Sequence, residues 1–171
     1  MKKPDTEYEK RKPSYSAVVL LLLLNLCGVL CAKTFYRALS GKLSHTKREL
    51  KKMQSYYELA CQWIFLKNHH KDLGDFFRMR NWKTIAIYGG GNFGQRLCEE
   101  LCGAGLSVKF FIDQEEGGEI LGIPVLNVEE IDTEVDVIVV TVLQAYEEIY
   151  ELLRGRTKAD ILSLSDVVYY L

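Results

Sequence analysis

The sequence predicts an α/β protein with a small doubly wound parallel sheet, preceded by one transmembrane helix and a helical neck. Residues 17–32 carry no charge. An apolar run at 84–88 ends in a glycine-rich turn, and short β-branched runs alternate with helical patterns after it. We therefore divide the chain into a polar tail (1–16), a transmembrane helix (17–36), a helical neck (37–82) and a nucleotide-binding type of domain (83–171).

The apolar run near the N-terminus is long enough to cross a membrane. From Tyr15 to Tyr36 there are 22 positions, which at about 1.5 Å of rise each cover a hydrocarbon core of about 30 Å. The two tyrosines fit the two membrane interfaces, and Lys33 can extend its ammonium group outward. A cleaved signal peptide is the alternative, but Leu30 is too bulky for a cleavage site after Ala32.

Basic residues flank this run on both sides, five before it and seven within the twenty residues after it. The excess favours a single-pass protein of the cell membrane with its C-terminal domain in the cytoplasm. The five cysteines form no C-x-x-C pair, so we expect free thiols in a reducing compartment. An exported domain is the alternative topology.

Charge is distributed unevenly along the chain. Residues 33–82 carry eleven Lys and Arg against four Asp and Glu, whereas residues 83–171 carry six against sixteen. The acidic balance of the domain argues against nucleic acid as its partner, because phosphate binding needs a basic face. The basic neck suits a position near anionic lipid headgroups.

The neck has a helical pattern from residue 40 to residue 67, with one apolar stripe that Thr46 interrupts. Its members are Leu43, Leu50, Met53, Tyr57, Ala60 and Ile64. Three heptads allow a coiled coil, and hence a homodimer through the neck. They also allow a single helix that packs this stripe on its own domain, which is the interpretation we favour. A short second helix is expected at 72–81.

The domain begins with strand, tight turn and helix, because the run KTIAIYGGGNFG places Gly89, Gly91 and Gly94 at G-x-G-x-x-G spacing. Glycine at these positions permits the turn, the approach of backbone N–H groups to a phosphate, and close packing of helix on strand. The fingerprint also expects an acid after the next strand, and Asp113 follows strand 107–112.

The rest of the domain alternates in the same way. We expect a helix at 93–103, a flexible acidic loop at 113–119, a short edge strand at 122–126 that contains Pro124, and a buried strand at 135–142. A helix at 144–154, a strand at 161–164 and a terminal segment at 166–171 complete it. The predicted strand order is 3-2-1-4-5, with a ligand crevice between strands one and four.

The predicted cofactor-binding residues are Gly89, Gly91, Asn92, Phe93, Gly94, Asp113 and Thr141. For the glycines, the alternative to phosphate binding is a turn kept for packing. Asp113 either accepts hydrogen bonds from a ribose or caps its loop, and Thr141 either faces a ligand or ends its strand. No Lys or Arg accompanies Asp113, so NADP is disfavoured relative to NAD or a nucleotide sugar.

The runs IAIYGGGNFGQRL, FFID, ILGIPVL and VDVIVVT resemble the small Rossmann-like domain at the N-terminus of bacterial sugar acyltransferases. They also resemble membrane-anchored domains associated with polysaccharide biosynthesis. The resemblance covers about residues 83–165. It implies a nucleotide or nucleotide sugar at the glycine turn, with Asp113 near the ribose or base. The acyltransferases' catalytic β-helix has no counterpart in this sequence, so acyl transfer is not implied.

No catalytic set is evident in the domain. All three histidines, His45, His69 and His70, precede it, and its many carboxylates look like a solvated face. We therefore expect a membrane-tethered binding or regulatory module of surface glycan biosynthesis, without a metal, rather than an enzyme. The alternatives are a subunit of a nucleotide-sugar-modifying or NAD-dependent enzyme that needs a partner, and a partner-docking domain with an empty crevice.

Overall fold

The computed structural model describes residues 15–114, 117–131 and 134–171, and the chain divides into two compact units, Met1–Leu50 and Lys51–Leu171. Helix α1 (Tyr15–Asn68) accounts for the described part of the first unit and continues into the second. Within the described residues, one helix, over Val18–Asn68, has the length and apolar composition needed to cross a membrane. All but the last two residues of the predicted polar tail lie outside the described residues.

The second unit contains a six-stranded sheet in the order β3-β4-β2-β1-β5-β6. All neighbouring strands run parallel except β3 and β4. The strands are β1 (Thr84–Tyr88), β2 (Ser107–Ile112), β3 (Glu119–Ile120), β4 (Ile123–Leu126), β5 (Val137–Val140) and β6 (Asp160–Ser163). The mixed α/β class is as predicted.

The strand order differs from the predicted 3-2-1-4-5 because an additional strand, β3, lies at the sheet edge. The sequence pattern assigned Glu119 to an acidic loop and Ile120 to no element, yet both residues pair antiparallel with β4. Leu121 and Gly122 join the two strands, with φ of 56° and 75°. Two successive positive φ angles form the tight turn that matches strand twist in a hairpin. Leucine is a rare residue in such a turn, so the sequence pattern does not predict it.

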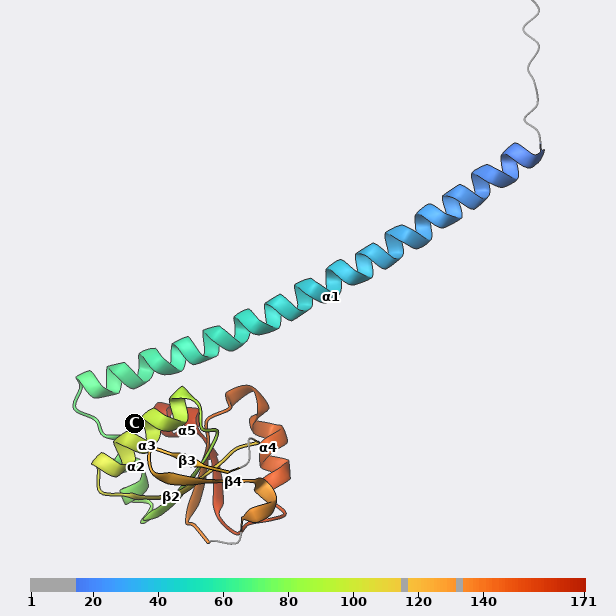
Figure 1. The fold of residues 1–171 in the computed structure, drawn as a ribbon. Helices are drawn as coiled ribbons and strands as arrows, with labels where there is room; N and C mark the ends of the chain where they lie inside the picture. The colour runs from blue at the N-terminus through green and yellow to red at the C-terminus, as the bar shows by residue number, and fades with distance from the viewer. Residues whose placement is uncertain (1–14, 115–116, 132–133) are drawn as a thin grey trace, which may run out of the picture. The chain divides into compact units, whose positions relative to one another are not determined.

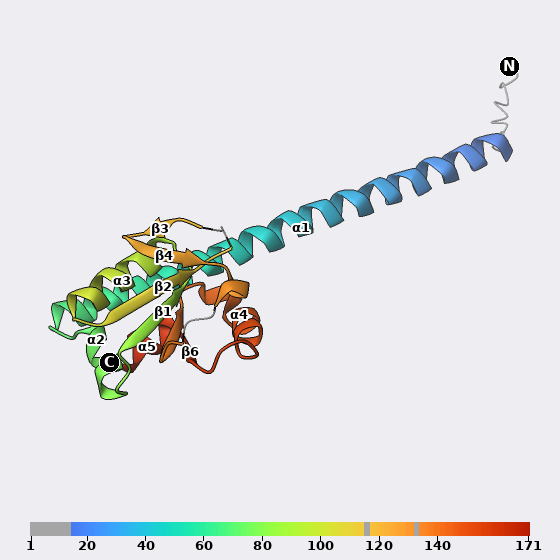
Figure 2. The ribbon, with the colours of Figure 1, turned by 60° about the horizontal axis from the view of Figure 1, so that its bottom comes forward.

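Helices cover both faces of the sheet (Figures 1 and 2). On one face lie residues 51–68 of α1 with α2 (Leu73–Met79), α3 (Asn92–Gly103) and α5 (Leu164–Tyr170), and on the other lies α4 (Tyr146–Leu153). The 3₁₀ turns Val128–Glu130 and Leu143–Ala145 lie in the connections. Strand β1 alternates as its period of two requires, with Ile85 and Ile87 toward the first face and Ala86 and Tyr88 toward the second.

The neck helix does not pack on the domain through the predicted stripe, so the favoured interpretation is wrong. In residues 51–68 the buried side chains are Leu59, Trp63 and Leu66, whereas Tyr57 and Ile64 of the stripe are 71% and 60% exposed. A second helical face therefore makes the contact. This face carries Trp63, the largest side chain of these turns, whose indole N–H finds a hydrogen-bond acceptor there, as a buried indole N–H requires.

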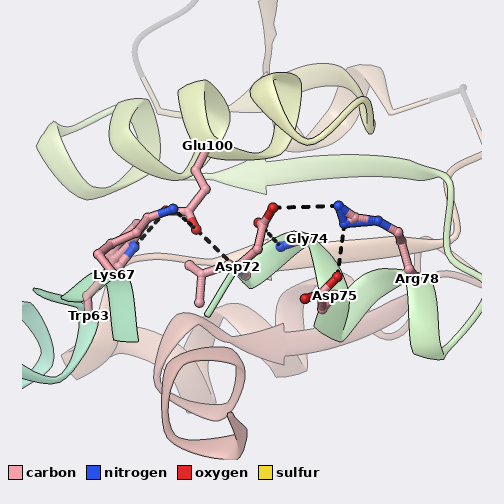
Figure 3. A network of polar contacts seen from close by, with 8 residues as sticks. Trp63, Lys67, Asp72, Gly74, Asp75, Arg78 and Glu100 are labelled. Atoms are coloured by element: carbon pink, nitrogen blue, oxygen red, sulfur yellow. Dashed lines mark hydrogen bonds and ion pairs between the residues drawn. The ribbon is translucent and has the colours of Figure 1, made fainter. Parts of the chain in front are cut away.

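That acceptor is Glu100, on α3, which joins three helices (Figure 3). Its side chain is only 8% exposed and pairs with Lys67. It accepts hydrogen bonds from Trp63 Nε1 at 2.8 Å and from the backbone N–H of Leu73 at 3.0 Å. The prediction that the domain's carboxylates form a solvated face is wrong at this position, because Glu100 exchanges water for three donors.

Helix α2 follows at once and is capped by its own residues (Figure 3). Asp72 accepts a hydrogen bond from Gly74 N at 2.8 Å, and Arg78 lies 3.5 Å from Asp72 and 3.2 Å from Asp75. The cap satisfies an N–H group that has no partner within the helix. It fixes where the chain turns from α1 toward β1.

Candidate functional site: the crevice at the glycine turn

Two of the three motif glycines are required by packing within the domain. Gly89 has a φ of +100° and donates its N–H to Ile112 O at 2.9 Å. A Cβ atom on Gly94 would lie 2.0 Å from Gly89 O. The absence of a side chain at Gly94 therefore lets α3 approach the end of β1, as the fingerprint requires.

Gly91 is different, because nothing in the protein occupies the space where its side chain would be. Its φ is −70°, which any residue adopts, and no atom lies within 4 Å of the Cβ position. Gly91 is the N-cap of α3, and its cap lacks a side-chain hydrogen bond. The first backbone N–H groups of a helix have no intrahelical acceptor and carry its positive dipole end. The open space at Gly91 thus adjoins an electropositive group of donors.

This space belongs to a cavity of about 460 Å³ at the carboxyl ends of β1 and β5. It is lined by Met53, Tyr56, Gly89, Gly91, Asn92, Phe93, Asp113, Thr141 and Val142. Six of the seven predicted site residues therefore lie together. Gly94 is not in the lining, because it lies where α3 meets β1.

A second cavity of about 370 Å³ adjoins the first and shares Gly89, Asp113 and Val142 with it. Tyr88, Gln114, Ala145, Glu148, Ile149 and Leu152 complete its lining, so it extends toward α4. The two cavities share the glycine turn, so together they offer room for a two-part ligand. Parallel α/β sheets bind ligands at this edge.

Asp113 closes the glycine turn. Its Oδ2 accepts a hydrogen bond from Gly90 N at 2.8 Å, and Oδ1 accepts one from Gln114 N at 2.7 Å. Ile120 covers Gly90, since a Cβ there would lie 2.3 Å from Ile120 Cδ1. Each carboxylate oxygen can accept more than one hydrogen bond, and Asp113 lines both cavities. The loop-capping role is therefore present, and a ligand role stays a prediction.

Thr141 is almost entirely buried, at 4% exposure. Its hydroxyl lies 3.0 Å from Tyr88 O and 3.2 Å from Gly89 O. A hydroxyl has one hydrogen to donate, and here the carbonyl groups of Tyr88 and Gly89 receive it. Thr141 holds the ends of β5 and β1 together and has only acceptor capacity left for a ligand.

Two residues of the neck helix also line the crevice, and sequence reasoning missed both. Tyr56 stacks on Phe93 with ring centroids 5.1 Å apart, and its hydroxyl lies 3.4 Å from Thr141 O. Met53 lies one turn earlier and lines the same cavity. Nothing in the local pattern distinguishes them from other neck residues, because their place depends on packing with residues more than thirty positions away.

The lining of the two cavities contains no Lys or Arg among the residues described, and it includes Asp113 and Glu148. A bound anion would therefore depend on backbone N–H groups and the α3 dipole. Burial, reinforced by the charge of Asp113, raises the pKa of Tyr88 above its ordinary value. Its phenol stays protonated at neutral pH.

The fold and the crevice together define a parallel α/β domain with a glycine turn between its first strand and the following helix. The chain matches no protein-family model and no curated protein sequence. Among solved structures, RSP, a Rex-family repressor, is similar at 19% identity with a TM-score of 0.39, over 52% of this chain and 56% of that one. The chain thus spans a little over half of that protein's length, and so slight a likeness supports no conclusion about function.

Proposed function

We propose that this protein is a membrane-anchored, Rossmann-like module that binds a nucleotide, a nucleotide sugar or NAD. The observation that carries the proposal is one cavity that six of the seven predicted cofactor-binding residues line. Its open side, at Gly91, lies beside the uncapped N-terminus of α3. A diphosphate needs such a group of N–H donors with room for close approach.

The rest of the crevice suits the other parts of such a ligand. The stacked rings of Tyr56 and Phe93 offer an apolar wall to a base or sugar ring. Tyr88 offers a neutral hydroxyl in the adjoining cavity. Because both cavities lack a basic side chain among the residues described, a ligand with an additional 2′-phosphate, such as NADP, is disfavoured.

We place the module beside the machinery of surface polysaccharide or glycan biosynthesis. The support is the resemblance of its motifs to the N-terminal domains of sugar acyltransferases, together with the long apolar helix. A binding or regulatory role is preferred over catalysis. Among the described residues that line the crevice, no nucleophile is paired with a base and an orienting group.

A second candidate is a partner-docking domain whose crevice stays empty. It is favoured by the two polar side chains expected to face a ligand, Asp113 and Thr141, which instead hydrogen-bond to the protein's own backbone. In this case the glycine turn serves packing alone.

A melting experiment on the full chain in detergent micelles distinguishes the ligand-binding function from the partner-docking function. The probes are NAD, NADP, UDP-sugars, CDP-sugars and coenzyme A. A ligand present at a hundred times its dissociation constant adds about 2.7 kcal/mol to the free energy of unfolding, which raises the melting temperature of a domain this size by roughly 10 °C. We expect one ligand class to act.

The matched control is Gly91→Val, whose Cβ atom would meet no other atom of the protein within 4 Å and whose methyl groups would occupy the open space. It should fold like the unsubstituted chain and lose the ligand shift. A shift that survives in this variant would place the ligand elsewhere. A panel with no shift at all would favour the docking domain.

A further inference from the structure

The last part of α1, residues 51–68, has two apolar faces, and the domain covers one of them. Leu59, Trp63 and Leu66 are at most 8% exposed. Met53, Tyr57 and Ile64 are 68%, 71% and 60% exposed, although their spacing of four and seven residues places them on one stripe of the helix. The domain fold therefore leaves a complete apolar stripe in contact with water.

The spacing of this stripe continues toward the N-terminus. It forms a heptad stripe, which we define as Tyr36, Leu39, Leu43, Leu50, Met53, Tyr57, Ala60 and Ile64, with Thr46 at the one polar position. Its large members are all more than half exposed. Unlike the uncharged run at 17–32, residues 36–64 carry many charges between the apolar positions, which is the pattern of a helix that pairs in water.

A groove of about 630 Å³ borders the stripe where α1 passes α3. Ala60, Trp63, Ile64 and Lys67 line it from α1, and Asn92, Phe93, Arg96, Glu99 and Glu100 line it from α3. Ala60 and Ile64 belong to both the groove and the stripe. A helix lying on the stripe would thus gain a second contact along α3, through the residues that line this groove.

We propose that a second copy of this chain occupies the stripe, so that two α1 helices pair in parallel. An a/d heptad stripe is complementary to itself when two identical helices run in the same direction and in register. The apolar segment within Val18–Asn68 gives two copies in one bilayer the same orientation. The pairing does not require a ligand in the crevice, although Met53 belongs to both the stripe and the crevice lining.

The area is sufficient for a stable pair. Burying one large apolar side chain removes roughly 60–120 Å² of apolar surface from water. The seven large members of the stripe would thus bury roughly 800–1,700 Å² over two copies, which reaches the size of stable interfaces. The groove beside α3 adds to this area.

Cysteine cross-linking of the full chain in membranes tests the pairing. The background has serine at the exposed Cys27, Cys31, Cys61 and Cys102, with the buried Cys98 kept. Each test variant adds to this background one cysteine at a position of the stripe, either Met53→Cys or Tyr57→Cys. The control is Glu58→Cys, an equally exposed position about 100° around the helix from Tyr57.

On mild oxidation, the Met53→Cys and Tyr57→Cys chains should shift to twice the mass, and the Glu58→Cys chain should stay at the mass of one chain. Equal cross-linking at all three positions would indicate random collision and overturn the proposal. So would the absence of a shift at the two stripe positions, or a cross-link to a different protein.

A second measurement does not depend on introduced cysteines. Sedimentation of the unsubstituted chain in detergent should give the mass of two chains, and Tyr57→Glu should reduce it to one. Since Tyr57 is exposed, this variant should keep the melting temperature of the domain measured at a concentration where both proteins are monomeric. A one-chain mass for the unsubstituted protein across the micromolar range would refute the pairing.

Discussion

Substituting alanine at Gly94 and at Gly91 should have opposite consequences, although both glycines belong to one motif. At Gly94 the new Cβ would lie 2.0 Å from Gly89 O, a backbone atom that no side-chain rotation can move. At Gly91 it would meet no atom within 4 Å. The pair therefore separates the glycine that packing needs from the glycine whose open space a ligand would use.

The expected magnitudes follow from these distances. An ordinary contact begins near 3.4 Å, so α3 must retreat by about 1.4 Å (3.4 − 2.0) from the end of β1 in Gly94→Ala. That movement disturbs the packing of Leu97 and Leu101, which are fully buried on α3. Overpacking of this kind costs typically 1–3 kcal/mol, and we expect about 3 kcal/mol here. In Gly91→Ala, the poorer N-cap and the lower entropy of the unfolded chain nearly offset each other, within about 0.5 kcal/mol.

Thermal unfolding of the full chain in detergent, followed by tryptophan fluorescence, measures both effects. Gly94→Ala should lower the melting temperature by roughly 10 °C, and Gly91→Ala should leave it within about 2 °C. Equal losses in the two variants would show that Gly91 is also a packing residue, and an unchanged melting temperature in Gly94→Ala would refute the close approach of α3 to β1.

Three further substitutions or labelling experiments probe other parts of the domain. Asp136→Ala should cost about 1 kcal/mol at pH 7, because this exposed carboxylate accepts two backbone N–H groups and one hydroxyl at the start of β1. Those hydrogen bonds lower the pKa of Asp136 below its ordinary 3.8. The unsubstituted chain should therefore exceed Asp136→Ala in free energy of unfolding by the whole amount above pH 3.8, and by less as the pH falls through the lowered pKa. Urea titrations at each pH measure this difference. Burial, together with Cys102 and Glu99, raises the pKa of the Cys98 thiol to about 12. At pH 8 a thiol reagent should therefore modify the exposed Cys102 in the native chain and reach Cys98 only after unfolding. If mass spectrometry found Cys98 labelled in the native chain, its burial would be contradicted. Glu100→Ala leaves Trp63 Nε1 and the backbone N–H of Leu73 without their acceptor. It should lower the free energy of unfolding, measured with denaturant, by about 3 kcal/mol. An unchanged free energy of unfolding would mean that water replaces the carboxylate.

The local sequence pattern was sufficient for most elements of the domain. Glycine spacing located the turn before α3, and a β-branched run located β5, because these signals depend on neighbouring residues alone. Strand β3, and with it the hairpin to β4, was missed since Leu121 is an unusual residue at positive φ, although Gly122 beside it is a common one. The helix at the C-terminus, α5, was expected only as a terminal segment, although Ser163 and Asp166 form a capping box at its start.

In the candidate site, too, some features follow from the local sequence and others depend on tertiary packing. The sequence by itself determined the strand, the glycine turn and the following helix, and so it named six residues that line one cavity. Only the tertiary structure decided that Asp113 forms a hydrogen bond with the glycine turn and Thr141 one with the end of β1. It also decided that Tyr56 and Met53 of the neck line the crevice and that Glu100 is buried. Turn and helix preferences act over a few residues along the chain, whereas burial and the choice of hydrogen-bond partner depend on which distant surfaces meet. Two apolar faces of similar strength lie on the neck helix, and its sequence could not say which one the domain would cover.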